Sequence, residues 1–134
     1  MAHFVTLLMV TVGDVVRFHT RETISDAGVA TFGCSYFIAA HPRIKAIFDG
    51  GTPLTTEMWH PIVRPHYHLP AALPAAVAIL EDVEATEPAI QGDAWVLAEM
   101  HKLRDACQYG IAHGLAMVVV LSNTLSRPPS GNRG

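Results

Sequence analysis

The chain contains few cysteines. Cys34 and Cys107 are the two thiols among its 134 residues, whereas a small secreted scaffold held by disulfides usually carries at least about four cysteines. We therefore expect both thiols to be reduced and buried as small apolar side chains, as in a cytoplasmic protein.

Basic residues are scarce as well. Nine Lys and Arg stand against twelve Asp and Glu, the net charge is −3, and 16% of the residues are charged. Because binding to a phosphate backbone draws on an excess of positive charge, this composition argues against a DNA- or RNA-binding module.

Long hydrophobic runs are also missing, although half of the residues are hydrophobic. No stretch approaches the roughly 20 consecutive apolar residues of a membrane helix. The apolar run 4–10 has no Lys or Arg before it and no small-residue cleavage site after it, so it does not resemble a signal peptide. We expect a soluble protein without a membrane partner, with a single domain over 1–125 and a flexible tail over 126–134.

Complete catalytic motifs are absent from the sequence. The glycines at 13, 28 and 33 fit neither the Walker nor the Rossmann spacing, and Gly33-Cys34-Ser35 lacks the pattern of a nucleophile elbow. The sequence therefore marks no catalytic residue.

The first part of the chain predicts a β-hairpin. Residues 3–12 are mostly β-branched or aliphatic, residues 15–21 alternate in character with a period of two, and Gly13-Asp14 between them suits a tight turn. The first of these strands is apolar on both faces, which indicates a position inside the sheet.

Prolines and glycines divide the middle of the chain. Pro42 and Gly50 fit the two ends of a short helix, and Thr52-Pro53 suggests another helical turn that reaches toward residue 59. The four prolines within 60–74 predict an extended loop or edge segment. Pro74 then begins a helix that we expect to run to about residue 85.

The strongest helix signal lies between Asp93, a predicted cap, and Gly114, a predicted stop. Its core stripe steps by three or four residues through Val96, Met100, Leu103, Cys107 and Ile111. On the same helix, we expect His101 and Asp105 to pair on the solvated side, with Glu99 and Arg104 nearby.

The order of these elements predicts the fold class. Residues 34–40 form either a strand or a short buried helix, with a strand favoured, and residues 115–121 form a buried strand. We expect an α+β two-layer sandwich, with a mainly antiparallel sheet, the first and last strands central, and the long helix packed across one face.

Eight histidines are the most unusual feature of the composition. His66 and His68 would point the same way from an extended segment, and His60 and Glu57 could complete a set of zinc or iron(II) ligands. That set would define a metal-dependent hydrolase or oxygenase. We favour the simpler interpretation, a proline-stiffened loop that binds no cofactor, because the spacing matches no strong metal motif.

Negative charge is concentrated in one stretch. Residues 1–68 are electrically balanced, whereas residues 81–105 carry seven carboxylates against Lys102 and Arg104, a net charge of −5. A patch of this kind attracts a basic protein partner. The residues that we expect to bind the partner are the acidic group Glu81, Asp82, Glu84, Glu87 and Asp93, with the aromatic anchors Trp59 and Tyr67.

The sequence thus favours a small non-enzymatic protein-binding module of the inhibitor, immunity-protein or antitoxin type, which could also form a homodimer. The metal-dependent enzyme is the alternative. A third hypothesis is a ligand-binding fold with an apolar pocket between sheet and helix.

Overall fold

The structure is a computed structural model that describes residues 2–18, 29–54 and 65–123. Its centre is a five-stranded antiparallel sheet in the order β2-β1-β5-β4-β3. The strands are β1 Ala2–Val10, β2 Ala30–Ser35, β3 Thr52–Pro53, β4 His66–His68 and β5 Ala116–Asn123.

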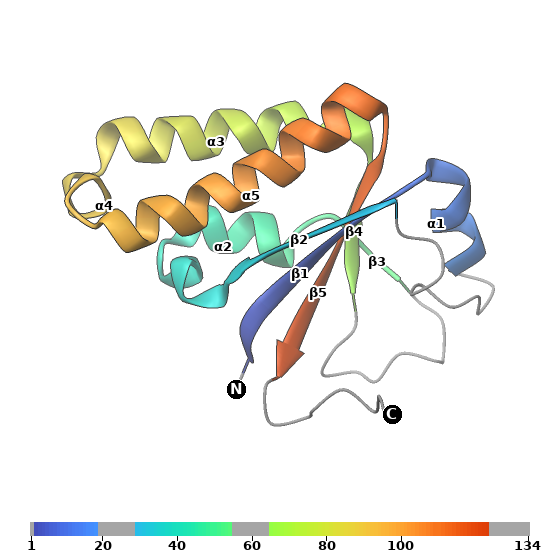
Figure 1. The fold of residues 1–134 in the computed structure, drawn as a ribbon, viewed down its shortest axis with the longest axis horizontal. Coiled ribbons are helices and arrows are strands. Elements are labelled where there is room, and N and C mark those ends of the chain that lie inside the picture. The colour runs from blue at the N-terminus through green and yellow to red at the C-terminus, as the bar shows by residue number, and fades with distance from the viewer. Residues whose placement is uncertain (1, 19–28, 55–64, 124–134) are drawn as a thin grey trace.

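Helices α2, α3 and α5 cover one face of this sheet, with α3 and α5 lying side by side above it (Figure 1), whereas Val15 of α1 packs in the cluster on the other face. The helices are α1 Val12–Phe18, α2 Pro42–Asp49, α3 Leu73–Thr86, α4 Pro88–Gln91 and α5 Ala94–His113, with 3-10 turns η1 Tyr36–Ala40 and η3 Pro70–Ala72. The predicted two-layer α+β sandwich, with the first and last strands central and the long helix across one face, is confirmed.

Strand β1 contributes to an apolar cluster on each face of the sheet. Val5, Leu7 and Met9 are buried against the helices, while Leu8 and Val10 are buried on the opposite face. Successive side chains of a strand alternate between faces, so an interior strand flanked by two clusters must be apolar throughout. This explains the continuous hydrophobic run at the start of the sequence.

The predicted hairpin is wrong, because residues 12–18 form helix α1 in place of a second strand. The hydroxyl of Thr11 accepts a hydrogen bond from the backbone N–H of Asp14 at 3.2 Å. The Asp14 carboxylate also lies in the first turn, where the helix dipole favours negative charge. Thr11-Val12-Gly13-Asp14 is thus a helix start of the Thr-x-x-Asp type, a signal stronger than the short alternation after it.

Two shorter segments also differ from their predicted form. Residues 34–40 are strand only as far as Ser35, whose hydroxyl accepts from the backbone N–H of Phe37 and begins η1. Thr52-Pro53 starts no helix but forms β3, which pairs with β4. Gly51 has a φ of 81°, so the chain turns there before it enters the sheet. Strand β4 is not at an edge, because β3 covers its outer side.

The predicted ends of the long helix are confirmed. Asp93 caps α5 by accepting hydrogen bonds from the N–H groups of Trp95 and Val96, and Gly114 ends it with a φ of 65°. Most of the predicted core stripe is buried, but Ile111 is 41% exposed. Gly110 lies in the core there, and its missing side chain lets the helix approach Leu73.

Within the described ranges, no helix has both the length and the apolar character needed to span a lipid bilayer.

Candidate functional site

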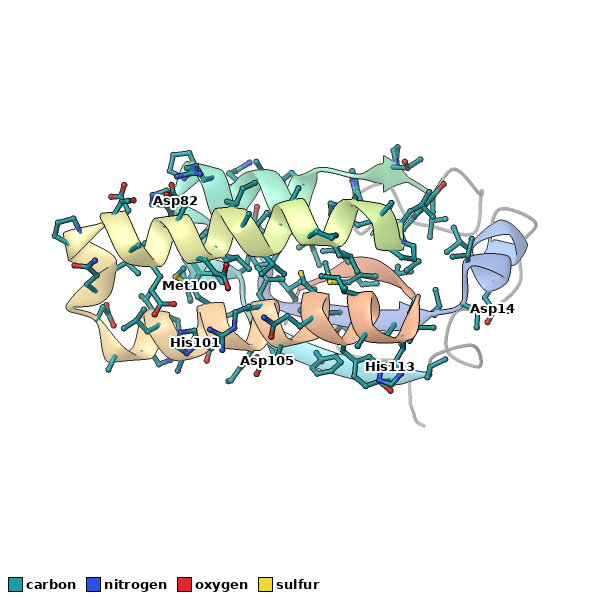
Figure 2. All side chains as sticks on the ribbon, turned by 90° about the horizontal axis from the view of Figure 1, so that it is seen from above. Asp14, Asp82, Met100, His101, Asp105 and His113 are labelled. Atoms are coloured by element: carbon teal, nitrogen blue, oxygen red, sulfur yellow. The ribbon has the colours of Figure 1, made fainter. Side chains whose placement is uncertain are left out.

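The carboxylates that we expect to bind a partner lie on α3, at the turn into α4 and at the start of α5. Figure 2 looks down on this helical layer, with α3 and α5 antiparallel and Asp82 and His101 labelled. Three of these carboxylates lie next to a basic side chain of another element.

Three ion pairs connect α3 and its C-terminal end to other elements. Asp82 accepts from Arg43 of α2 at 2.5 Å, and Glu84 lies 2.8 Å from the imidazole of His101 on α5. Glu87 lies 3.7 Å from the ring of His41. These groups are partly to largely exposed, and exposed ion pairs contribute only about 0–1 kcal/mol each. The pairs therefore orient the carboxylates but hold them only weakly.

The predicted pair between His101 and Asp105 is wrong, since His101 contacts Glu84 of α3. Asp105 instead lies 3.5 Å from Arg104, its neighbour in sequence. A helix packed beside α5 provides a partner that spacing along one helix could not reveal.

Asp93 has a structural task. Its Oδ1 accepts from two backbone N–H groups at the start of α5, each at 3.1 Å. This carboxylate therefore stabilises the start of α5, and one of its oxygens already accepts two hydrogen bonds.

Glu81 differs from the other carboxylates of α3. It is exposed and makes no ion pair or hydrogen bond with another described residue. It also lines two neighbouring hollows over α3 and α5. A carboxylate without an ion pair to another described residue is therefore shared by the linings of both hollows.

The first hollow has a volume of about 400 Å³ and a largely apolar lining. Besides Glu81, the lining consists of Pro74, Val77, Ala78, Gln108, Ile111 and Ala112. Ile111, which leaves the predicted core stripe, contributes its exposed side chain here. The second hollow measures about 460 Å³ and is more polar, with Glu81, Glu84, Ala85, Gln91, Leu97 and Arg104 around it. We call the two together the α3–α5 groove.

The predicted aromatic anchors do not join this groove. Tyr67 is on β4, where it packs against the apolar cluster on the sheet face opposite the helices. Trp59 lies outside the described residues. The described aromatic residue exposed near the acidic surface is Trp95, at 51% exposure in the first turn of α5.

His66 and His68 lie on the helix-facing side of β4, as their spacing predicts. They are paired in register with Val119 and Met117, which belong to the core cluster beneath the helices. The His68 Nε2 atom lies 2.8 Å from the carbonyl oxygen of Ile47 in α2. A carbonyl only accepts, so Nε2 carries the hydrogen in this arrangement. Burial lowers the pKa of His68, and nearby His66 acts in the same direction.

The structure describes His66 and His68, two of the four proposed metal ligands. The Nδ1 atom of His66 is buried without a hydrogen-bond partner among the described residues. Glu57 and His60 lie outside those residues. In the described part of the chain, no three His, Cys, Asp or Glu side chains are grouped as metal ligands would be. The four-residue metal set remains a prediction.

A small hollow of about 160 Å³ lies beside His68, between α2 and α3. Apart from His68, its wall consists of four alanines, two isoleucines, Gly50 and Gly51. It is smaller than the roughly 300–1,000 Å³ of typical ligand pockets. Thus it gives little support to the third hypothesis, the binding of a sizeable ligand.

Glu99 is a residue that sequence reasoning misplaced. It is only 7% exposed, although we expected it near the solvated side of α5. Its carboxylate accepts from the backbone N–H of Ser35 and from the Nζ of Lys102, both at 2.8 Å. Glu99 therefore ties α5 to the end of β2, a contact between residues 64 positions apart.

Both cysteines are free and buried, as expected. Burial raises the pKa of Cys34 and of Cys107 to about 12. The Cys107 Sγ lies 3.9 Å from the Sδ of Met117 in the core. These thiols have the surroundings of structural, unreactive cysteines.

The fold and surface define a two-layer α+β protein with a grooved acidic helical layer. Comparisons with protein-family models, curated proteins and solved structures found no match for this chain.

Proposed function

We propose that this protein is a non-enzymatic protein-binding module of the inhibitor, immunity-protein or antitoxin type, which holds a basic partner on its α3–α5 groove. The observation that carries the proposal is the position of Glu81, which lines both an apolar hollow and a polar one and makes no ion pair with another described residue.

The shape and chemistry of the groove favour an amphipathic helix from the partner. Such helices place apolar residues at positions i, i+3 or i+4, and i+7 into a hydrophobic groove. The apolar hollow around Val77 and Ile111 would accept these anchors. A Lys or Arg next to them would reach Glu81.

The other carboxylates would steer the partner and add to its affinity. Asp82, Glu84 and Glu87 are held by exposed ion pairs that exchange at little cost. A surface of one sign increases the rate of association with an oppositely charged partner, and this effect decreases with added salt.

A synthetic peptide tests the proposal directly. The probe is a helix with Leu on one face and Lys on the other, and its control is an isomer of the same composition without amphipathic spacing. We expect the probe to bind, measured by fluorescence anisotropy, and Glu81→Lys to weaken it about tenfold, equivalent to about 1.4 kcal/mol. Val77→Glu should weaken it as well, because a charge would occupy the apolar hollow.

The matched control is Asp14→Lys, which changes the net charge by the same amount on α1, away from the groove (Figure 2). This variant should bind the probe nearly as well as the unaltered protein. Equal losses from the two charge reversals would mean that net charge alone attracts the peptide, and the groove would be rejected as the binding site.

The metal-dependent enzyme is the second candidate, and the observation in its favour is the buried Nδ1 atom of His66, which has no hydrogen-bond partner among the described residues. Elemental analysis of untagged protein tests it. The candidate is rejected if the protein contains less than about one zinc or iron ion per several chains and the double variant His66→Ala, His68→Ala has the same metal content.

We also propose that the protein works in the cytoplasm. Support comes from Cys34 and Cys107, which are free and fully buried and so fit a reducing compartment. Fractionation of the source cells with an antibody against the protein would test this.

A further inference from the structure

The two edges of the sheet differ in length and composition. Strand β3, at one edge, has two residues, one of which is Pro53. Strand β2, at the other edge, has six residues and contains no proline and no charged residue. Natural sheets usually protect an edge by shortness, proline or a charged side chain. Only β3 has such protection.

The direction of the backbone groups on β2 follows from one hydrogen bond. The N–H of Ser35 donates to Glu99 on α5 and is therefore not directed at β1. In an antiparallel ladder, alternate residues direct their N–H and C=O groups to the same side. Thr31 and Gly33 consequently present these groups at the outer side of β2, while Phe32 and Cys34 face β1. No turn or loop hydrogen bond in the described ranges engages Thr31 or Gly33.

Exposed apolar side chains surround this edge. Val29 precedes β2 and is 53% exposed, and Phe37 follows it at 63%. Phe4 of β1 is 45% exposed, and its ring lies directly over Gly33, where a Cβ atom would come within 2.3 Å of the Phe4 Cζ. The edge therefore combines backbone groups that no other described strand pairs with and apolar contact area on either side.

We propose that β2 is the site of self-association, where it pairs antiparallel with the β2 strand of a second copy and joins the two sheets into one. A two-fold axis brings each strand against itself in reverse. Because β2 is uncharged, no like charges on the strand oppose each other in this arrangement. Phe4, Val29 and Phe37 of each copy would flank the joined strands.

This interface leaves the α3–α5 groove accessible. In Figure 2, β2 emerges beyond α5 on the side away from α3, which carries Glu81. Each copy in the pair therefore keeps its own groove. The inference does not depend on the proposed function, because it rests on the β2 edge of the sheet and not on the α3–α5 groove.

The oligomeric state and two variants at one position test the interface. We expect size-exclusion chromatography with light scattering to give a dimer. Thr31→Lys should give a monomer with an unchanged circular dichroism spectrum, because Thr31 is exposed and a lysine at an edge opposes strand pairing. Thr31→Ser, the matched control, should remain a dimer.

Amide hydrogen exchange measured by NMR supplies a readout specific to the edge. The Gly33 amide should be protected in the dimer and should exchange rapidly in Thr31→Lys, whereas the Phe32 amide, bonded within the chain, should be protected in both. A protein that is monomeric alone, a dimer that survives Thr31→Lys, or a Gly33 amide equally protected in both proteins would overturn the proposal. If β2 pairs only with a strand of another protein, this chain will be monomeric alone, and the proposal is overturned.

Discussion

The helical layer has an outer surface and an inner surface, and the same residue types serve different purposes on each. On the outside, Glu84 and His101 form an exposed pair that solvent can separate. On the inside, buried Glu99 and His68 bind backbone groups of β2 and α2. The comparison teaches that a carboxylate or imidazole in this fold is committed to the structure when it binds a backbone group, and is available for a partner when it does not.

The largest effect should come from the inner carboxylate. Glu99→Ala removes the charged acceptor of the Ser35 N–H from a part-buried hydrogen bond, and a bond to a charged group contributes about 1.5–3 kcal/mol. We expect a loss of this size in the free energy of unfolding in urea. Glu87→Ala, on the outer surface, should change that free energy by no more than about 0.5 kcal/mol. Equal losses from the two variants would break the distinction between the surfaces.

Stability measured over a range of pH tests the inner surface, because His68 lies there. Because burial lowers the pKa of His68 in the folded protein, the unfolded chain takes up a proton first as the pH falls below about 6.5. Stability should therefore decrease from about pH 7.5 to about pH 5.5, measured by urea unfolding.

The variant His68→Gln isolates this contribution. Its amide can still donate to the Ile47 carbonyl, but it does not titrate, so the decrease in stability toward low pH should be smaller. If the pH dependence of the variant equals that of the unaltered protein, His68 is not its source.

Charge reversals on the outer surface should change the rate of partner association more than the stability of the fold. Changing Glu81, Asp82, Glu84 and Glu87 together to Lys should slow association with the basic helical probe about tenfold or more at low salt. The melting temperature should change little, because exposed ion pairs contribute little to stability. Stopped-flow fluorescence at two salt concentrations measures the rate, and an effect that persists at high salt would contradict steering.

The smallest effect is expected for the two thiols. Since the pKa of each is about 12, iodoacetamide at about pH 8 should leave Cys34 and Cys107 unmodified in the folded protein. Mass spectrometry should detect modification of both after unfolding in urea. Rapid labelling of the folded protein would show that the core beneath the helices opens.

Local signals in the sequence predicted the helical layer well. Asp93 and Gly114 define α5 through caps that act within a few residues, and the apolar runs of β1 and β5 predict central strands. Helix α1 was predictable too, from Thr11 and Asp14, but the alternation that follows them favoured a strand.

The inner contacts could not be predicted, because their partners are distant in sequence. The bond from Ser35 to Glu99 joins residues 64 apart, and His68 meets a carbonyl 21 residues away. Only the packing of α5 and α2 against the sheet brings these groups together. For the same reason, the net charge of the acidic surface could be counted in the sequence, but which carboxylate makes no ion pair with another described residue could not be predicted.

The short, proline-containing strand β3 also limits how far this molecule can assemble. When two copies join through β2, the β2 edge of each copy is paired, and the edges that remain are the two β3 strands. A strand of two residues with Pro53 offers little template for another chain. Pairing through β2 therefore produces a closed assembly of two copies, whereas a sheet with two open edges could add copies without end and grow into a fibre.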